Sequence, residues 1–116
     1  MGAIAKAKNV RMSARKMRLV IDQIRGRDVD EAFAILQFSK KKASQAIDKV
    51  LRSAVANARY RADEGGESLD VDDLFVREAY VDEGQTLKRW RARAYGRATP
   101  VLKRSSHITV IVDTRE

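Results

Sequence analysis

The hydrophobic positions of this chain change from a two-residue to a helical period near its beginning. Residues 4–10 alternate between small alanines and a second face, which predicts a short strand. That second face consists of Ile4, Lys6, Lys8 and Val10. A helical stripe then follows Ser13, a residue type that caps helix N-termini. The stripe consists of Met17, Val20, Ile21 and Ile24, and Gly26 after it favours a left-handed helix end.

Two further helices are predicted before a polar segment. Asp28 followed by Glu31 resembles a capping box and starts a short second helix. The apolar positions of this helix are Val29, Ala32, Phe33 and Leu36. Ser39 is expected to cap a third helix, whose buried stripe is Ala43, Ile47, Val50, Leu51, Ala54 and Ala58. Residues 63–73 are polar and predict a loop.

Two strands are predicted after this loop. Residues 74–81 and 108–112 are rich in β-forming residues, and Ile108, Val110 and Val112 share one face. The 116 residues suffice for one domain. We therefore expect a single α+β domain over residues 1–116, in which three helices pack on a small antiparallel sheet.

Residues 82–107 separate two strands that should pair with each other. A structureless loop of this length is unusual in so small a domain, so we expect both strands to continue into a long protruding β-hairpin. The turn of this basic arm is expected near residues 89–94. Trp90 has two interpretations: it packs across the ribbon and stiffens the tip, or it stacks on a base or ribose.

Charge is segregated along the chain, whose net charge is +8. Residues 1–27 carry a net charge of +7, residues 28–83 carry −5, and residues 84–107 carry +7 without a single acid. Two basic blocks around an acidic middle are typical of a protein that binds a polyphosphate. The alternative is a solvated basic surface that has no partner.

Cations also stand at predicted helix starts, where the helix dipole disfavours them. They are Arg15, Lys16 and Arg18 at the first helix and Lys40, Lys41 and Lys42 at the third. A docked phosphate would reverse the sign of this interaction, because it accepts from free N–H groups and pairs with the cations. Exposed and screened side chains, which cost little, are the alternative.

Several classes of function are excluded by composition. The chain has no cysteine and one histidine, which excludes disulfides, thiol catalysis and sites built on several thiolates or histidines. No apolar run approaches the roughly 20 residues of a membrane span. His107 and its serine neighbours lie on a predicted strand, where they alternate sides and assemble no catalytic triad. We expect a soluble intracellular protein that is not an enzyme and has no cofactor and no metal.

Residues 88–112, KRWRARAYGRATPVLKRSSHITVIV, resemble the C-terminal signature of the bacterial-type large-subunit ribosomal protein L-twenty-two family. That signature has a basic residue, a gap of four, Arg-Ala-x-Gly-Arg, nine further residues, and then His with an alternating aliphatic strand. The matching residues are Lys88, Arg93, Ala94, Gly96, Arg97, His107, Ile108, Val110 and Val112. VDEG at 81–84, SARKMRLVIDQIRG at 13–26 and KKASQAIDKVLRSAVANA at 41–58 are also similar to the family. The chain departs from it at Gln85 and Ala92, where many members have proline, and at Trp90 and Arg91.

The resemblance implies a structural constituent of the large ribosomal subunit that binds 23S rRNA and helps subunit assembly. It also implies a hairpin tip that lines the exit tunnel of the nascent polypeptide. Implied partners are 23S rRNA, neighbouring large-subunit proteins and the nascent chain, without a membrane and without a homo-oligomer. The expected location is the cytoplasmic ribosome, and an organellar ribosome stays open.

The expected rRNA-binding residues are Lys6, Lys8, Arg11, Ser13, Arg15, Lys16, Arg18, Lys40, Lys41, Lys42, Lys88, Arg89, Arg91, Arg93, Arg97, Lys103, Arg104 and His107. The expected tunnel tip consists of Lys88, Arg89, Trp90, Arg91, Ala92 and Arg93. A DNA-binding regulator and a small nuclease are the rival functions. The regulator would need polar base-reading side chains on a helix, and the nuclease would need acids that converge near the basic blocks.

Overall fold

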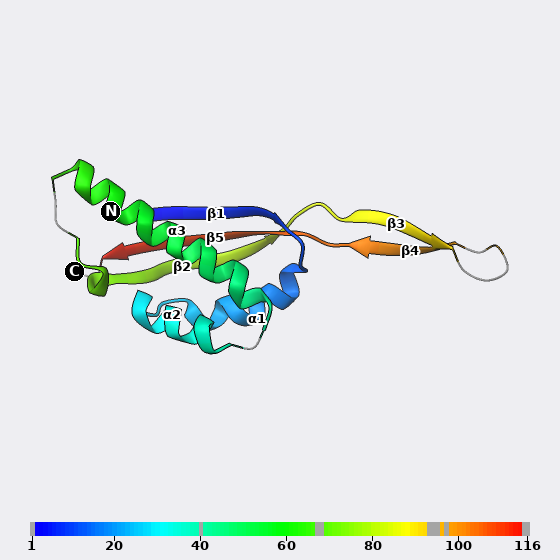
Figure 1. Cartoon of the computed structure of the whole chain (residues 1–116), viewed down its shortest axis with the longest axis horizontal. Helices are drawn as coiled ribbons and strands as arrows, with labels where there is room; N and C mark the ends of the chain where they lie inside the picture. Colours follow the sequence, from blue (N-terminus) through cyan, green and yellow to red (C-terminus); the bar gives the residue numbers. More distant parts are fainter. Residues whose placement is uncertain (1, 40, 67–68, 93–95, 97, 115–116) are drawn as a thin grey trace.

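The computed structural model describes residues 2–39, 41–66, 69–92, 96 and 98–114. A body of three helices and a three-stranded sheet carries a two-stranded arm (Figure 1). The elements are β1 (Ala3–Val10), α1 (Ala14–Ile24), α2 (Val29–Phe38), α3 (Ala43–Glu64), the 3-10 helix η1 (Val71–Asp73), β2 (Leu74–Glu83), β3 (Leu87–Ala92), β4 (Ala98–Lys103) and β5 (Ser106–Thr114). The predicted α+β class and the order of its elements are confirmed.

The sheet of the body is antiparallel, with the strand order β1-β5-β2. Its central strand buries Ile108, Val110 and Val112 completely against the helices. The apolar stripe of α1 is equally buried, at Met17, Val20, Ile21 and Ile24. Both predicted faces are therefore confirmed, and the buried core that they form is aliphatic.

The observed helix ends agree only in part with those predicted from the sequence. Ser13 caps α1, because its Oγ accepts a hydrogen bond from the backbone N–H of Lys16 at 3.4 Å, and Gly26 has a φ of +79°. The predicted cap of α3 by Ser39 is wrong, since α3 begins only at Ala43. Ser39 instead ends α2, and its Oγ accepts from the N–H of Lys41 at 3.3 Å, which stabilises the turn between the helices.

The capping box predicted for α2 is wrong as well. Asp28 does occupy the N-cap position, but its side chain makes no capping hydrogen bond. Glu31 lies 3.6 Å from the guanidinium of Arg27 instead, so an ion pair takes the place of the reciprocal cap.

The arm protrudes from the body, as predicted. The molecule measures 67 × 27 × 16 Å, and its radius of gyration of 17.7 Å exceeds the roughly 13 Å expected for a compact chain of this length. Strands β3 and β4 pair from Leu87–Lys103 outward to Ala92–Ala98. The predicted turn near residues 89–94 is therefore wrong, because Ala92 is still paired. The connection comprises residues 93–97, of which 93–95 and 97 lie outside the described residues.

The arm does not simply continue the strands of the body. The ladder is interrupted between Glu83 and Leu87 on one side, and between Lys103 and Ser106 on the other. We call these connecting residues, 84–86 and 104–105, the neck. Two hydrogen bonds cross it: the N–H of Gly84 donates to the carbonyl of Ser105 at 2.9 Å, and the Ser105 Oγ donates to the carbonyl of Gln85 at 2.6 Å.

Candidate nucleic-acid interface

Cations from two distant parts of the sequence meet beside the neck. A groove of about 420 Å³ lies between the connection from β1 to α1 and the end of β4. Its lining residues are Arg11, Met12, Ser13, Lys16, Leu102, Lys103 and Arg104, and no carboxylate is among them. We call this the neck groove. The fold thus joins the first and the last predicted basic blocks into one surface.

A second groove of about 520 Å³ lies between β1 and α3. Lys6, Arg11 and Lys42 from the predicted set line it, together with Lys49. Arg11 and Met12 line both grooves, so the two basic surfaces are continuous. We call this one the β1–α3 groove.

A smaller cavity of about 50 Å³ also lies beside the neck. Ser13, Arg15 and Arg104 line it, and here one acid, Glu83, is also present. The predicted residues that the structure brings together are therefore Lys6, Arg11, Ser13, Arg15, Lys16, Lys42, Lys103 and Arg104.

These cations have no anionic partner within the described part of the chain. The ion pairs found there join Arg25 to Asp22, Arg27 to Glu31, Arg52 to Asp48 and Arg77 to Asp113. None of them uses a cation that lines the neck groove or the β1–α3 groove. Like charges held together without counter-charges repel each other, and an anionic ligand relieves that repulsion.

Acids gather at the opposite end of the molecule from the arm, where α3 ends and η1 leads into β2 (Figure 1). Asp70 accepts a hydrogen bond from the N–H of Asp72 at 3.0 Å. A hydrogen bond with the Asp30 carboxyl, the charge of Asp30, and then the charges of Asp70 and Asp73 raise the pKa of Asp72 above its usual value. The acids at this end are thus separated in three dimensions from the basic surfaces near the neck.

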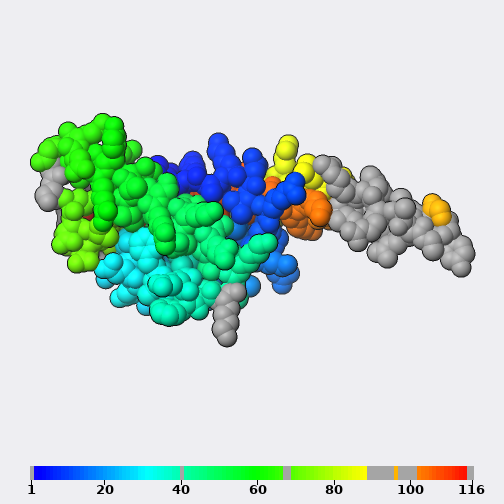
Figure 2. Space-filling view, in the orientation of Figure 1, coloured from blue at the N-terminus to red at the C-terminus, as the bar shows by residue number. Residues whose placement is uncertain are grey.

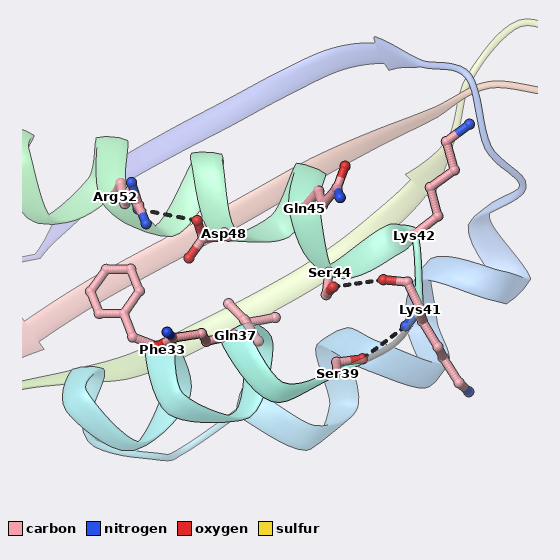
Figure 3. A pocket seen from close by; sticks show the side chains of 10 residues that line it. Phe33, Gln37, Ser39, Lys41, Lys42, Ser44, Gln45, Asp48 and Arg52 are labelled. Carbon is pink, nitrogen blue, oxygen red and sulfur yellow. Dashed lines mark hydrogen bonds and ion pairs between the residues drawn. The ribbon is translucent and has the colours of Figure 1, made fainter.

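The cations at the start of α3 separate from each other. Lys41 and Lys42 both line a pocket of about 660 Å³ between α2 and α3, but their side chains extend to opposite sides (Figure 3). The same pocket contains Asp48, which pairs with Arg52 at 3.1 Å. Of Lys41 and Lys42, the second also lines the β1–α3 groove and the first does not, and Lys40 lies outside the described residues.

Arg18 has a structural contact that the sequence does not show. Its Nε and one terminal nitrogen donate to the carbonyl of Val81 at 3.2 and 2.9 Å, which ties α1 to β2. Arg25 binds the carbonyl of Ala79 in the same way, at 3.0 and 2.7 Å. The two arginines are seven residues apart, a spacing that places them on one helix face and could have indicated a shared role.

His107 also has a structural contact. Its Nδ1 accepts a hydrogen bond from the backbone N–H of Asn9 at 3.1 Å, where β1 is bulged and Asn9 has a φ of +59°. The end of β1 is thereby fastened to β5 beside the neck. An RNA contact was expected for His107, and the structure shows that this residue also has a defined partner within the chain.

The other predicted residues stand apart from the grooves. Lys8 is exposed on β1 and lines neither groove. Lys88, Arg89 and Arg91 lie in β3, and so do Trp90 and Ala92. Among these arm residues the structure describes only the side chain of Lys88. Arg93 and Arg97 lie outside the described residues.

Sequence reasoning missed Lys49 and the apolar parts of the grooves. Lys49 follows Lys42 by seven residues, so helical periodicity could have placed both on one face of α3.

Within the described residues no helix is long and apolar enough to cross a membrane. The same residues hold no group of three or more acids or histidines that could bind a metal ion.

The fold and the grooves define a class of protein: a small basic α+β body that carries a β-ribbon arm with uncovered cations at its base. A family model described as Ribosomal protein L22p/L17e matches residues 5–113. The chain belongs to this ribosomal protein family, which confirms the resemblance found in the sequence.

Curated relatives agree over nearly the full length. The chain is 56% identical to the large ribosomal subunit protein uL22 of Lacticaseibacillus casei, over 98% of this chain and 93% of the relative. It is 53% identical to uL22 of Bifidobacterium animalis subsp. lactis, over 100% and 98% of the two chains. The identity to uL22 of Ligilactobacillus salivarius is 57%, over 97% and 94%.

Proposed function

We propose that this chain is a structural constituent of the large ribosomal subunit and binds 23S rRNA through the neck groove and the β1–α3 groove. The relatives are named as large-subunit proteins, which supports the location on the ribosome, in the cytoplasm. The observation that carries rRNA binding is the neck groove, where Arg11, Lys16, Lys103 and Arg104 meet without a carboxylate. Binding is mainly to phosphates and to RNA shape, because the groove offers charge rather than a pattern of base-reading groups.

The arm gives the protein a second role in the same proposal. A two-stranded ribbon has two open edges and few buried side chains, so by itself it is only marginally stable. RNA packed around the arm would supply both counter-charge and walls, and the protein would thereby help the subunit to assemble beside neighbouring proteins. In this proposal the tip of the arm, at residues 88–93, lines the tunnel of the nascent chain.

The salt dependence of binding tests the first part. Affinity of the full chain for a large-subunit rRNA fragment should fall steeply with salt, by a slope of roughly 0.7 to 0.9 per neutralised phosphate. Duplex DNA of random sequence should compete weakly, and RNA incubated with the protein and Mg²⁺ should remain intact. Binding that is insensitive to salt would contradict the proposal. Equal affinity for duplex DNA would favour a DNA-binding regulator, and cleavage of the RNA would favour a nuclease.

Crosslinking tests the tunnel assignment. The chain has no cysteine, so a single cysteine at Ala92 carries a crosslinker to one defined place. Ribosomes that contain the Ala92→Cys chain should crosslink to a nascent polypeptide. Ribosomes that contain Arg59→Cys, on the exposed side of α3 in the body, are the control and should not. Equal crosslinking from both positions, or none from Ala92→Cys, would contradict this part.

A further inference from the structure

The β1–α3 groove has an apolar floor beneath its basic rim. The floor residues are Ala7, Val10, Met12, Ala46 and Val50, and the rim cations are Lys6, Arg11, Lys42 and Lys49. Its volume of about 520 Å³ lies within the range of pockets that hold small ligands, about 300–1,000 Å³. The groove therefore combines a surface for an apolar group with charges for an anion.

The way in which α3 lies along the edge of the sheet forms this groove. Arg61 donates to the carbonyl of Gly2 at 2.7 Å, and Asn57 donates to the carbonyl of Ile4 at 3.0 Å, so one end of β1 is covered by α3. Further along, towards the bulge at Asn9, α3 presents the small side chain of Ala46 and the groove opens. Figure 2 shows this face, with the residues of β1 in blue beside those of α3 in green.

The charges of the rim select an anionic ligand. Within the described residues the four rim cations form no ion pairs, and no carboxylate lines the groove. A phosphate alone would gain nothing from the apolar floor. A nucleotide in a single-stranded stretch has both features, because its base has an apolar face and its chain has a phosphate on either side.

We propose that the β1–α3 groove holds the base of one unpaired nucleotide of the bound RNA. The base lies on Ala46, Val50 and Met12, and the rim cations contact the phosphates next to it. This inference rests on the proposed rRNA binding and specifies the kind of nucleotide that the groove recognises. Continuity with the neck groove through Arg11 and Met12 favours RNA over an acidic peptide, since one RNA strand can follow both surfaces.

A pair of matched RNAs tests the proposal. One is a fully paired stem, and the other is the same stem with a single unpaired nucleotide. The full chain should bind the second RNA more tightly, by on the order of tenfold, as expected when roughly 55 Å² of apolar surface is buried. Ala46→Phe fills the floor and should abolish this preference while the paired stem still binds. Ala56→Phe, at an exposed position of the same helix outside the groove, is the control and should keep the preference.

A measurement on the unaltered chain makes the test independent of how Ala46→Phe folds. Ring currents of a stacked base should move the methyl signals of Met12 and Val50 upfield when the RNA with the unpaired nucleotide is added. The paired stem should leave them in place. Upfield shifts confined to the first RNA support the proposal.

Three results would overturn the proposal. The unaltered chain could bind the two RNAs with equal affinity, or the methyl signals of Met12 and Val50 could stay in place when the RNA with the unpaired nucleotide is added. A folded Ala46→Phe chain could also lose its binding to both RNAs. Tighter occupation of the groove by an acidic amphipathic peptide would also overturn it and would assign the groove to a protein. In each of these cases, salt-dependent binding of both RNAs would leave the proposed rRNA binding intact. Failure of any RNA to bind in a salt-dependent way would remove the proposed function itself.

Discussion

A Cβ atom placed on Gly84 would lie 2.7 Å from the Oγ of Ser105, so the two sides of the neck approach more closely than a side chain allows. The same atom would lie 3.1 Å from Cε1 of His107. Since the Ser105 Oγ already donates to the carbonyl of Gln85, it cannot move aside without losing that hydrogen bond. The close approach thereby couples the direction of the arm to the end of the body sheet.

Gly84→Ala should therefore destabilise the protein by about 1 kcal/mol through overpacking, a loss of about 4 °C in Tm. Thermal unfolding followed by circular dichroism measures this change. Gly65→Ala is the matched control, because its nearest neighbours beyond the adjacent residues, the carbonyls of Arg61 and Ala62, are at ordinary distances of 3.6 and 3.7 Å. An unchanged Tm in Gly84→Ala would show that the neck yields easily and does not set the direction of the arm.

Lys103 and Arg104 should determine how strongly RNA binding depends on salt. Replacing both with glutamine removes two cations from the neck groove. The slope of log affinity against log salt should fall by about 2, with weaker binding to all RNA sequences alike. Arg59→Gln, in which an exposed cation of α3 outside the grooves is lost, should leave the slope unchanged. Equal effects of the two substitutions would mean that net charge, rather than the neck groove, carries the binding.

Local periodicity was enough to predict the elements of the body. The stripe from Met17 to Ile24 and the alternation from Ile108 to Val112 each occupy one continuous segment, and burial of that segment follows from its own pattern. The end of a helix depends instead on where the chain turns next. For this reason Ser39 was wrongly predicted to cap α3, whereas it ends α2 and its Oγ accepts from the N–H of Lys41.

Contacts between distant segments could not be predicted in this way. Glu83 pairs with Ser106 and Leu87 with Lys103, so the pairing of the two chain segments reaches Ala92–Ala98, and the turn lies beyond Ala92 and not at residues 89–94. The charge count indicated two basic blocks, but only the fold shows that Lys16 and Lys103 line one groove. Nor does a sequence show that Arg18 binds the carbonyl of Val81, which is 63 residues away along the chain.

Amide exchange in the arm should respond to RNA. The amides of β3 and β4 should exchange quickly in the free protein, because a two-stranded ribbon is marginally stable and its cations repel each other. On addition of a large-subunit rRNA fragment their exchange should slow, as measured by hydrogen exchange and mass spectrometry. The amide of Val110, in the central strand of the body sheet, serves as the internal reference and should be protected in both states. Slow exchange of the β3 and β4 amides already in the free protein would show that the ribbon is stable by itself.

Substitutions of Arg18 and Arg15 should distinguish an effect on the stability of the fold from an effect on RNA binding. Arg18→Met removes two charge-assisted hydrogen bonds to the carbonyl of Val81 and should lower the free energy of unfolding by about 1 kcal/mol. Arg15→Met removes an exposed cation beside the neck and should leave Tm unchanged while it weakens RNA binding. Thermal unfolding and RNA titration of both variants measure the two effects. A Tm that falls equally in both would mean that the bonds to Val81 contribute nothing specific.

The contribution of Asp72 to the free energy of unfolding should be less favourable at neutral pH than under mildly acidic conditions. The carboxyl of Asp30, by hydrogen bonding and by charge, and the charges of Asp70 and Asp73 raise the pKa of Asp72 in the folded state above its ordinary value of 3.8. The folded protein then holds this proton more tightly than the unfolded chain does. The free energy of unfolding should therefore fall as the pH rises from 3.8 through the raised folded pKa.

Asp72→Asn removes the repelling charge, so its Tm should exceed that of the unaltered chain at pH 7. The difference should vanish when the pH falls below the ordinary pKa of an aspartate, since both proteins are then neutral at this position. Thermal unfolding of both proteins across this pH range gives the comparison. Glu78→Gln, at an exposed position of β2 away from the acidic end, should show no such pH-dependent gain. A lower Tm of Asp72→Asn at pH 7 would mean that the hydrogen bonds of this turn outweigh the repulsion between its carboxylates.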